Sequence, residues 1–366
     1  MLGIDSGGSG VRVAVARAEA LLSGSAETPL TWASATPVGV GDRGIDAAGL
    51  LERVLPAAHE LLRRAGARRP AAVCVGAAGM ASLGDDLRAT LPGALAEEFG
   101  VRRLALAADA VTGYAGALGQ RPGAVVAAGT GLIALGAVPL PVPVPSAGGD
   151  ATTADPATAD PATGGRVPGW RRADGWGHLL GDCGGGAWIG RAGLEAAMRA
   201  YDGREGGSGP LLARLEAVFG PAGELPGKLY PRPDRPAVLA SFAAEVGRCA
   251  GGGDPVAEAI LRDAARHIAQ AAAAVCPRPE AGDIATGDIA TGDTATGDIA
   301  LTGGLFRMGA PLLAPLRAEL AARLPGVPVT EAAGDPLDGA LCVAAALAAG
   351  ELRLPLDAGL LSVITT

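Results

Sequence analysis

The amino-acid sequence predicts an α/β protein whose chain forms two similar domains facing a central cleft. The chain has 366 residues, of which 49% are hydrophobic, and this length favours two domains over a single core. Buried strands alternate with helical patterns, which predicts mostly parallel sheets with helices on both faces. A hairpin with a glycine-rich tip occurs in each half, which suggests a duplicated domain.

The composition argues against several classes of function. The net charge of -8 and the pI near 5.0 predict no nucleic-acid partner and no anionic-membrane partner, because both need clustered cations. Lys228 is the only lysine, so the chain has no Gly-Lys-Ser/Thr phosphate loop and no other candidate for a Schiff base. No apolar run reaches the roughly 18 to 20 residues that span a bilayer.

The cysteines and the first residues predict a soluble protein of the reducing cytoplasm. No two cysteines have metal-ligand spacing, and residues 2–4 predict a strand and not a charged-then-apolar leader. The five cysteines are Cys74, Cys183, Cys249, Cys276 and Cys342.

The first predicted element is the glycine-tipped hairpin of the first half. A short strand over residues 2–4 ends in Asp5-Ser6-Gly7-Gly8-Ser9-Gly10, and residues 11–16 alternate as a second strand. Because a strand follows the glycines, this is not the dinucleotide-binding fingerprint, in which a helix follows. Taken alone, the turn is most simply an ordinary hairpin.

Asp109 follows the last buried strand of the first half. Asp46 is expected to cap a helix that stops at Gly66, and buried strands are predicted over residues 71–76 and 104–108. Ligands collect at the carboxyl ends of strands in such sheets. We therefore expect Asp109 to take part in chemistry.

The second glycine-tipped hairpin opens the second half. Its predicted strands, residues 124–128 and 132–136, enclose Gly129-Thr130-Gly131. Residues 137–169 lose all periodicity and predict a flexible surface insertion. A second low-complexity tract repeats Gly-Asp-Ile-Ala-Thr from residue 282 and is interpreted as a duplicated loop.

The passage from Gly175 to Gly190 leads from a glycine-rich turn into a helix. Glycines at 184–186 are unfavourable inside a helix, and the apolar residues after them repeat at helical spacing up to Gly203. Asp182 therefore precedes a helix N-terminus, whose exposed amides favour anions. Asp182 is either a carboxylate that points into a cleft beside a polar ligand or the cap of its own helix.

The rest of the chain is predicted to be mostly helical. Asp335-Pro336 reads as an N-cap followed by a first-turn proline. The predicted segments are a Pro/Gly-rich connection over about 203–236, helices over 237–247 and 255–275, a strand over 298–302 that ends in Gly303-Gly304, and helices over about 309–324 and 336–349.

Carboxylates and glycine turns therefore gather at predicted strand ends. Glycine turns let backbone amides approach phosphate oxygens, and a carboxylate such as Asp5 holds hydrated magnesium. A second carboxylate is then free to deprotonate an incoming hydroxyl group, as phosphoryl transfer requires. Four such glycine clusters, each after a strand, are far more specific than one.

The order of these motifs resembles the BadF/BadG/BcrA/BcrD ATPase family, which includes N-acetylglucosamine kinases and bacterial glucosamine kinases. The resemblance implies two ribonuclease-H-like (actin-like ATPase) domains around a central cleft, over residues 1–112 and 113–366. The two low-complexity stretches, at about 139–168 and 279–297, are interpreted as insertions into the second domain, and the last helix is a candidate to pack back on the N-terminal domain. The motifs that carry it are Asp5-x-Gly-Gly-Ser, Asp109, Gly129-Thr-Gly131, Gly175-Trp-Gly-x-x-x-Gly-Asp182-x-Gly and Leu301-Thr-Gly-Gly304.

The resemblance also implies a role for each motif. Asp109 matches the general base that takes the proton from the sugar 6-hydroxyl, and Asp5 matches a ligand of Mg²⁺ through water. Thr130 would face both phosphate and sugar. The other implied sites are the first phosphate motif at Gly7, Gly8, Ser9 and Gly10, the second at Gly129, Thr130 and Gly131, the adenosine motif at Gly303 and Gly304, and the amino-sugar pocket at Gly175, Trp176 and Asp182.

Two positions depart from the family's pattern. Arg12 is the nearest cation after the first phosphate motif, where family members carry Thr followed by Lys or a similar long residue. Cys183-Gly184-Gly185 follows Asp182 in place of Glu-Gly-Ser. The roles of Cys183 and His178 stay open, as does sugar selectivity.

The implied function is an ATP- and Mg²⁺-dependent kinase that converts D-glucosamine to glucosamine 6-phosphate, with N-acetylglucosamine as the alternative substrate. A homodimer is suggested by the resemblance alone. A different class is the activator ATPase of a radical acyl-CoA dehydratase or reductase, which binds an iron–sulfur cluster through paired cysteines. A third class is a sensor without turnover. The scattered cysteines argue against the second class, and the intact Asp109 argues against the third.

Overall fold

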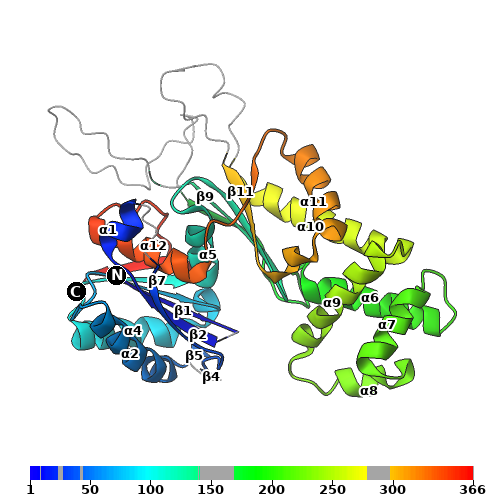
Figure 1. Cartoon of the computed structure of the whole chain (residues 1–366), viewed down its shortest axis with the longest axis horizontal. Coiled ribbons are helices and arrows are strands. Elements are labelled where there is room, and N and C mark those ends of the chain that lie inside the picture. Colours follow the sequence, from blue (N-terminus) through cyan, green and yellow to red (C-terminus); the bar gives the residue numbers. More distant parts are fainter. Residues whose placement is uncertain are drawn as a thin grey trace.

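The computed structural model describes residues 1–8, 10–23, 28–41, 44–138, 140, 169–277 and 297–365. Ser9 lies outside the described residues, and so do both predicted insertions apart from Leu140 and Gly297. The described residues form two lobes, each built around one β-sheet (Figure 1).

The sheet of the first lobe has six strands in the order β13-β7-β6-β1-β2-β3. The first three strands in the chain form antiparallel pairs, whereas β1, β6 and β7 run parallel and β13 is antiparallel to β7. The strands are β1 (Leu2–Gly7), β2 (Gly10–Val15), β3 (Leu30–Ser34), β6 (Val73–Ala77), β7 (Arg103–Ala108) and β13 (Leu361–Thr365).

The sheet of the second lobe repeats this topology with five strands in the order β10-β9-β8-β11-β12. Three antiparallel strands are again followed by two parallel ones. The repeat confirms the predicted duplicated α/β fold, but the prediction of mostly parallel sheets is wrong, because each glycine-tipped hairpin brings antiparallel pairs with it. The strands are β8 (Gly123–Ala128), β9 (Leu132–Val138), β10 (Gly169–Asp174), β11 (Asp298–Thr302) and β12 (Val329–Glu331).

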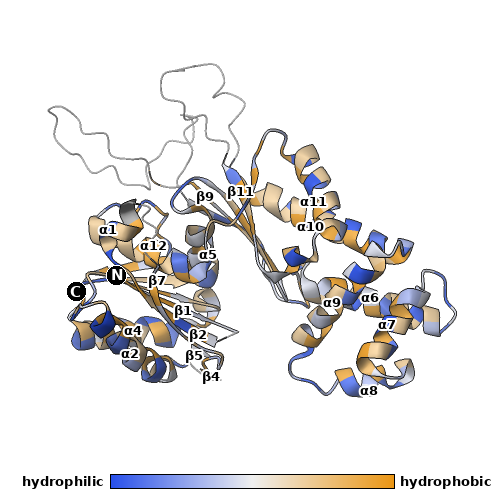
Figure 2. Cartoon of the chain, in the orientation of Figure 1, coloured by the Kyte–Doolittle hydropathy of each residue, from blue (hydrophilic) through white to orange (hydrophobic). Residues whose placement is uncertain are grey.

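Helices cover the first sheet on both faces. Asp46 caps α2 as predicted, since its carboxylate accepts a hydrogen bond from Gly49 N at 3.1 Å. Figure 2 shows hydrophilic residues on α2 and α4 and mainly hydrophobic ones along α12. The helices are α1 (Ala18–Ser23), α2 (Ala47–Arg64), α3 (Met80–Leu83), α4 (Asp85–Phe99), α5 (Asp109–Leu118) and α12 (Pro336–Ala349), and a small ribbon pairs β4 (Val40–Gly41) with β5 (Gly44–Ile45).

The second lobe is mostly helical outside its sheet. The prediction of a plain connection over residues 203–236 is wrong, because Ser208 caps an amphipathic helix there and Leu211 and Leu215 are buried. None of the helices in the described ranges is long and apolar enough to cross a membrane. The helices are α6 (Gly186–Tyr201), α7 (Gly209–Phe219), α8 (Leu225–Leu229), α9 (Arg235–Gly251), α10 (Pro255–Val275) and α11 (Ala310–Arg323), with 3₁₀ turns η3 (Ala222–Glu224) and η5 (Gly304–Met308).

Helices α5 and α12 cross closely at the junction of the two sheets. A side chain at Gly116 would meet Asp335 O at 2.0 Å, and one at Gly339 would meet Thr112 O at 1.8 Å, so the crossing requires both glycines. Helix α5 contacts strands of both sheets, and α12 packs on β1 and β6 of the first. The crossing therefore places Asp109, the first residue of α5, between the lobes. The predicted boundary after residue 112 falls inside α5, and this division of the chain stays a prediction.

Candidate active site

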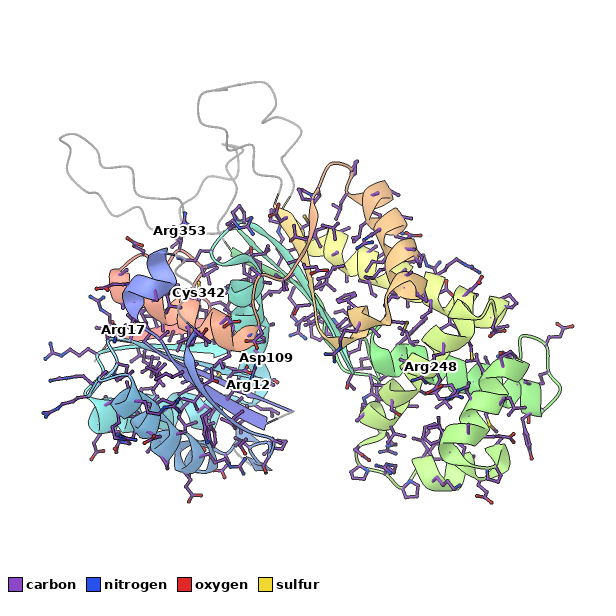
Figure 3. All side chains as sticks on the ribbon, viewed as in Figure 1. Arg12, Arg17, Asp109, Arg248, Cys342 and Arg353 are labelled. Atoms are coloured by element: carbon purple, nitrogen blue, oxygen red, sulfur yellow. The ribbon has the colours of Figure 1, made fainter. Side chains whose placement is uncertain are left out.

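Asp109 begins helix α5 directly after strand β7. Its carboxylate accepts a hydrogen bond from Ala110 N at 2.9 Å, and Figure 3 shows it at the side of the first lobe that faces the second. The side chain is accessible to solvent, yet the surrounding protein desolvates it. This desolvation raises the pKa of Asp109, and the negative charge of Asp5 adds to the rise, whereas the Ala110 amide and Arg172 oppose it. A raised pKa suits a general base that works nearer neutral pH.

Asp5, the predicted magnesium ligand, is paired with Arg12 across the β1–β2 hairpin. Arg12 donates from Nε at 3.0 Å and from Nη2 at 2.7 Å, both to Oδ2 of Asp5. Arg12 Nη1 also donates to Asp335, the N-cap of α12. Burial raises the pKa of Asp5, while Arg12 opposes this rise. The guanidinium of Arg12 is therefore held by two carboxylates, and a contact between Arg12 and phosphate stays a prediction.

The glycines of the first turn divide into two kinds. Gly10 has φ of 129°, and a Cβ there would lie 1.9 Å from Ser34 O, so the fold itself requires glycine. A Cβ at Gly7 or Gly8 would meet nothing within 4 Å. Neither packing nor backbone conformation requires glycine at these two positions. The space beside their backbone is open and could receive a ligand.

The Gly129-Thr130-Gly131 turn between β8 and β9 is braced by the start of α6. Gly186 N donates to Gly129 O and Ala187 N donates to Thr130 O, both at 2.8 Å. The prediction that exposed amides at this helix start favour an anion is therefore wrong for these two amides, because the turn's carbonyls already accept their hydrogen bonds. A Cβ at Gly129 would meet nothing within 4 Å, so the open side of this turn is at Gly129.

Asp182 links the Gly175–Gly181 loop to this turn. Its carboxylate accepts a hydrogen bond from Gly177 N at 3.1 Å, and its Oδ2 lies 2.3 Å from where a Cβ of Gly131 would stand. The alternative that Asp182 caps its own helix is wrong, because the N-cap of α6 is Gly185, with no side-chain bond. Burial raises the pKa of Asp182. Contact between Asp182 and a sugar stays a prediction.

Two residues that sequence reasoning missed hold the same loop. The carboxylate of Asp174 accepts hydrogen bonds from Asp182 N at 2.5 Å and Cys183 N at 3.0 Å. Arg172 donates to the carbonyls of Asp174 and Gly175 and stacks over the ring of Trp176, 4.4 Å from its centroid. Strand β10 was not predicted because its Gly-Trp-Arg-Arg-Ala-Asp sequence lacks apolar alternation. The pair Arg171-Arg172, just before the loop, was the sequence feature that could have indicated these interactions.

A cavity of about 490 Å³ joins the second turn to the predicted adenosine motif. Gly303 requires glycine, since its φ is 105° and a Cβ would lie 2.2 Å from Ala128 O. The residues of α9 that line this cavity are mostly small and leave room for a flat ring. Two arginines in the lining, Arg248 and Arg307, add positive charge, and Arg248 is labelled in Figure 3. The lining residues are Gly129, Gly186, Ala240, Ala243, Ala244, Gly247, Arg248, Gly304, Leu305, Arg307 and Met308.

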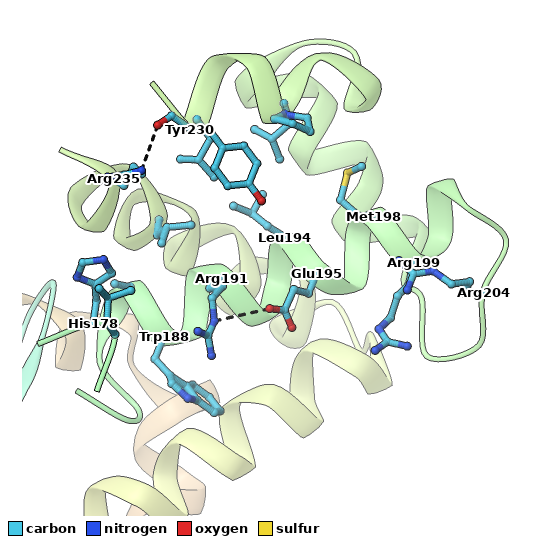
Figure 4. Close-up of a pocket in the computed structure, with 16 residues that line it drawn as sticks. His178, Trp188, Arg191, Leu194, Glu195, Met198, Arg199, Arg204, Tyr230 and Arg235 are labelled. Carbon is cyan, nitrogen blue, oxygen red and sulfur yellow. Dashed lines mark hydrogen bonds and ion pairs between the residues drawn. The ribbon is translucent and has the colours of Figure 1, made fainter. Parts of the chain in front are cut away.

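A larger cavity of about 720 Å³ follows one face of α6 (Figure 4). His178 and Leu179 connect it to the Gly175–Gly181 loop, but its lining includes no residue of the predicted phosphate and adenosine motifs. Arg191 pairs with Glu195 at 3.6 Å on one side, and Arg235 donates to Tyr230 O at 3.1 Å on another.

The predicted site residues thus lie on two lobes. Asp5, Asp109 and the first turn belong to the first lobe, whereas the second turn, the Gly175–Gly181 loop and the adenosine motif belong to the second. Within the described ranges, no group of three or more His, Cys, Asp or Glu side chains forms a metal site. Both hydrogen bonds from Arg12 end on one oxygen of Asp5, Oδ2. A hydrated Mg²⁺ that arrives with a nucleotide needs only one or two protein carboxylates, so Asp5 alone suits this role.

Solved structures share this two-lobed fold. A protein of Chromobacterium violaceum, provisionally assigned as an N-acetylglucosamine kinase, matches with a TM-score of 0.57 and 26% identity over 93% of this chain and 96% of its own. A protein of Porphyromonas gingivalis with the same provisional assignment matches with a TM-score of 0.60 and 16% identity over 93% and 97%. A ROK-family transcriptional regulator, a homologue of the E. coli MLC protein, matches with a TM-score of 0.51 and 14% identity over 96% and 79%.

Sequence comparison leads to one family. No curated protein matches the chain significantly. The model of the BadF/BadG/BcrA/BcrD ATPase family matches residues 168–348, which include the Gly175–Gly190 passage and the adenosine motif. This match and the shared fold confirm the resemblance predicted from the motifs and identify the chain, through residues 168–348, as related to the BadF/BadG/BcrA/BcrD ATPase family.

Proposed function

We propose that the protein is an ATP-dependent sugar kinase that transfers the γ-phosphoryl group to the 6-hydroxyl of an amino sugar. The observation that supports this most is the environment of Asp109, a solvent-accessible carboxylate with a raised pKa at the lobe junction. The fold alone is not sufficient, because a transcriptional regulator shares it. A carboxylate suited to accept a proton is what a kinase needs and a sensor does not.

In the proposed reaction, the bond between the γ-phosphorus and the bridging oxygen of ATP breaks and ADP leaves, and a bound Mg²⁺ would offset part of the negative charge of the phosphates. Asp109 accepts the proton of the sugar hydroxyl as that oxygen attacks. The open backbone at Gly7, Gly8 and Gly129 lets amides approach phosphate oxygens. The cavity between α9 and Gly304 would hold the adenosine. Asp5 would hold the metal through water.

The two candidate acceptors differ in charge. Asp109, Asp174 and Asp182 outnumber Arg172 around the loop and the base, and this excess of negative charge suits the protonated amine of D-glucosamine. D-Glucosamine is therefore the first candidate. N-Acetylglucosamine is the second, because the two provisionally assigned neighbours carry that name. A homodimer and a cytoplasmic location stay predictions.

The activator-ATPase alternative has little support from the cysteines. Cys74, Cys249 and Cys276 are buried. The two partly exposed cysteines lie on different lobes, Cys183 before α6 and Cys342 on α12. An iron assay on the anaerobically purified protein tests this alternative, which requires a bound cluster.

The proposed function is tested by ADP release with Mg²⁺ and ATP in the presence of D-glucosamine, N-acetylglucosamine, glucose or no sugar. We expect release to depend on an amino sugar and to be lost in Asp109→Asn. Hydrolysis that is independent of sugar, or equal rates with glucose, would count against the proposal.

A further inference from the structure

The Gly175–Gly181 loop is fastened at its base, whereas its tip is not packed in the core. Among the described residues, Asp174 and Asp182 are the two non-glycine residues with positive φ, 61° and 56°, and they turn the chain at either end of the loop. Their carboxylates bind the amides of Asp182, Cys183 and Gly177. Trp176, the second residue of the loop, keeps 64% of its surface exposed. Core packing therefore does not fix the position of its ring.

Arg172 is the side chain that holds this ring. It donates from Nε to Asp174 O at 3.0 Å and from Nη2 to Gly175 O at 2.5 Å. These two bonds orient the plane of the guanidinium, whose carbon lies 4.4 Å from the centroid of the Trp176 ring. Only a planar, forked cation can bind two carbonyls and cover an aromatic face at once. Arg172 therefore connects the end of β10, the first residue of the loop and the exposed tryptophan.

The charge of the same arginine also acts on the proposed catalytic base. Arg172 lowers the pKa of Asp109, against the larger effect of burial. Two charged side chains act on Asp109: Asp5 on β1 raises its pKa and Arg172 on β10 lowers it. Asp5 belongs to the first lobe and Arg172 to the second. The residue that covers the ring of Trp176 is therefore also the second-lobe charge that acts on Asp109.

We propose that Arg172 is the residue that positions Trp176 to receive the sugar, acting through the ring and not through contact with the substrate. One face of the ring is covered by the guanidinium, which leaves the other face for the apolar C–H side of a pyranose. The role in sugar binding rests on the proposed kinase function, whereas the clamp between Arg172 and Trp176 does not. The two parts are tested separately.

The clamp is tested first, on the protein without any ligand. Acrylamide quenching of tryptophan fluorescence is compared between wild type and Arg172→Gln. We expect stronger quenching in the variant, and no difference when both proteins carry Trp176→Leu, because Trp176 is then the source of the change. Arg171→Gln is the matched control, since it removes the same charge from the opposite face of the same strand. Equal quenching of wild type and Arg172→Gln would overturn the clamp.

The role in sugar binding is tested by steady-state kinetics. Arg172→Gln is expected to raise the KM for the sugar about five- to tenfold, with the KM for ATP unchanged. Arg172→Lys should recover part of the loss, because lysine keeps the cation over the ring but not the fork. Arg171→Gln should behave as wild type.

A double-mutant cycle decides whether Arg172 acts through the ring. If it does, adding Arg172→Gln to Trp176→Leu causes no further rise in the KM for the sugar. Additive losses, or an equal rise in the KM for ATP, would overturn the proposal. If wild type shows no sugar-dependent turnover, the kinase function and the sugar-binding role fail together, while the quenching result still decides the clamp.

Discussion

The β1–β2 hairpin of the first lobe and the β8–β9 hairpin of the second lobe occupy the same place in two sheets of one topology, yet different interactions hold their tips. The first is held by ion pairs, because Arg12 joins Asp5 to Asp335. The second is held by backbone hydrogen bonds, because two amides of α6 donate to the carbonyls of Gly129 and Thr130.

The two hairpins therefore contribute different features to the proposed site: the first contributes charged groups, and the second contributes part of a cavity wall. The first lobe places two carboxylates, Asp5 and Asp109, so that the negative charge of Asp5 raises the pKa of Asp109. The second turn contains no charged residue, and its neighbours Gly186 and Gly304 line the cavity that suits a nucleoside. The two lobes therefore share one sheet topology but differ in use: the first lobe carries the proposed base, and the second forms the wall of the proposed nucleotide site.

Asp109→Asn is the change expected to have the largest effect. Loss of the base should reduce turnover by about 10²- to 10⁴-fold, while nucleotide binding measured by calorimetry is retained. Because desolvation by the surrounding protein raises the pKa of Asp109, ionising this carboxyl group costs folding stability at neutral pH. The variant should therefore unfold at a temperature equal to or above that of wild type at pH 7. Full turnover in the variant would remove Asp109 from the reaction.

Asp5→Asn tests whether the charge of the first hairpin serves the nucleotide. We expect kcat/KM for ATP to fall by about 10²-fold, because the carboxylate that would hold the hydrated metal is gone. Raising the Mg²⁺ concentration should restore part of the loss. A variant with normal kinetics at low Mg²⁺ would show that the Asp5–Arg12 pair is only structural.

Two pairs of glycine substitutions distinguish glycines that the fold requires from glycines that nucleotide binding is proposed to require. Gly10→Ala and Gly131→Ala place a Cβ 1.9 Å from Ser34 O and 2.3 Å from Asp182 Oδ2, so each should lower the free energy of unfolding by about 1–3 kcal/mol. Gly7→Ala and Gly129→Ala meet nothing within 4 Å. They should leave thermal unfolding unchanged and raise the KM for ATP. Equal unfolding temperatures in all four variants would contradict this division.

The smallest expected effect is a shift in pH dependence. The base must be deprotonated, so kcat/KM should rise with pH through the pKa of Asp109, at a midpoint above the ordinary value of 3.8. The negative charge of Asp5 raises this pKa, so Asp5→Asn should move the midpoint to lower pH. A midpoint that moves to higher pH, or does not move, would show that Asp5 does not influence the base.

Most of the fold follows from local sequence signals, whereas the fastening of the loop does not. Glycine-tipped hairpins, the Asp46 cap and the Asp335-Pro336 helix start depend on neighbouring residues, and the structure contains each of them. Strand β10 lacks an apolar pattern because it lies at the edge of its sheet and is half exposed.

The interactions of Arg12 and Asp182 depend on residues far away in the chain. Arg12 pairs with Asp335, which is more than three hundred residues away, and only the α5–α12 crossing brings them together. Asp182 looks like a helix cap from its neighbours alone, but its carboxylate lies against Gly131 of the β8–β9 turn, and the N-cap of α6 is Gly185. No local pattern encodes either contact.

In the proposed reaction, the phosphoryl group reaches the sugar 6-hydroxyl with Asp109 as the base. Phosphorus NMR of the product formed from ATP and D-glucosamine tests this directly. We expect a phosphomonoester signal that is coupled to the two protons of the C6 methylene and is formed by wild type but not by Asp109→Asn. Inorganic phosphate as the sole product, or an ester at another hydroxyl group, would contradict it.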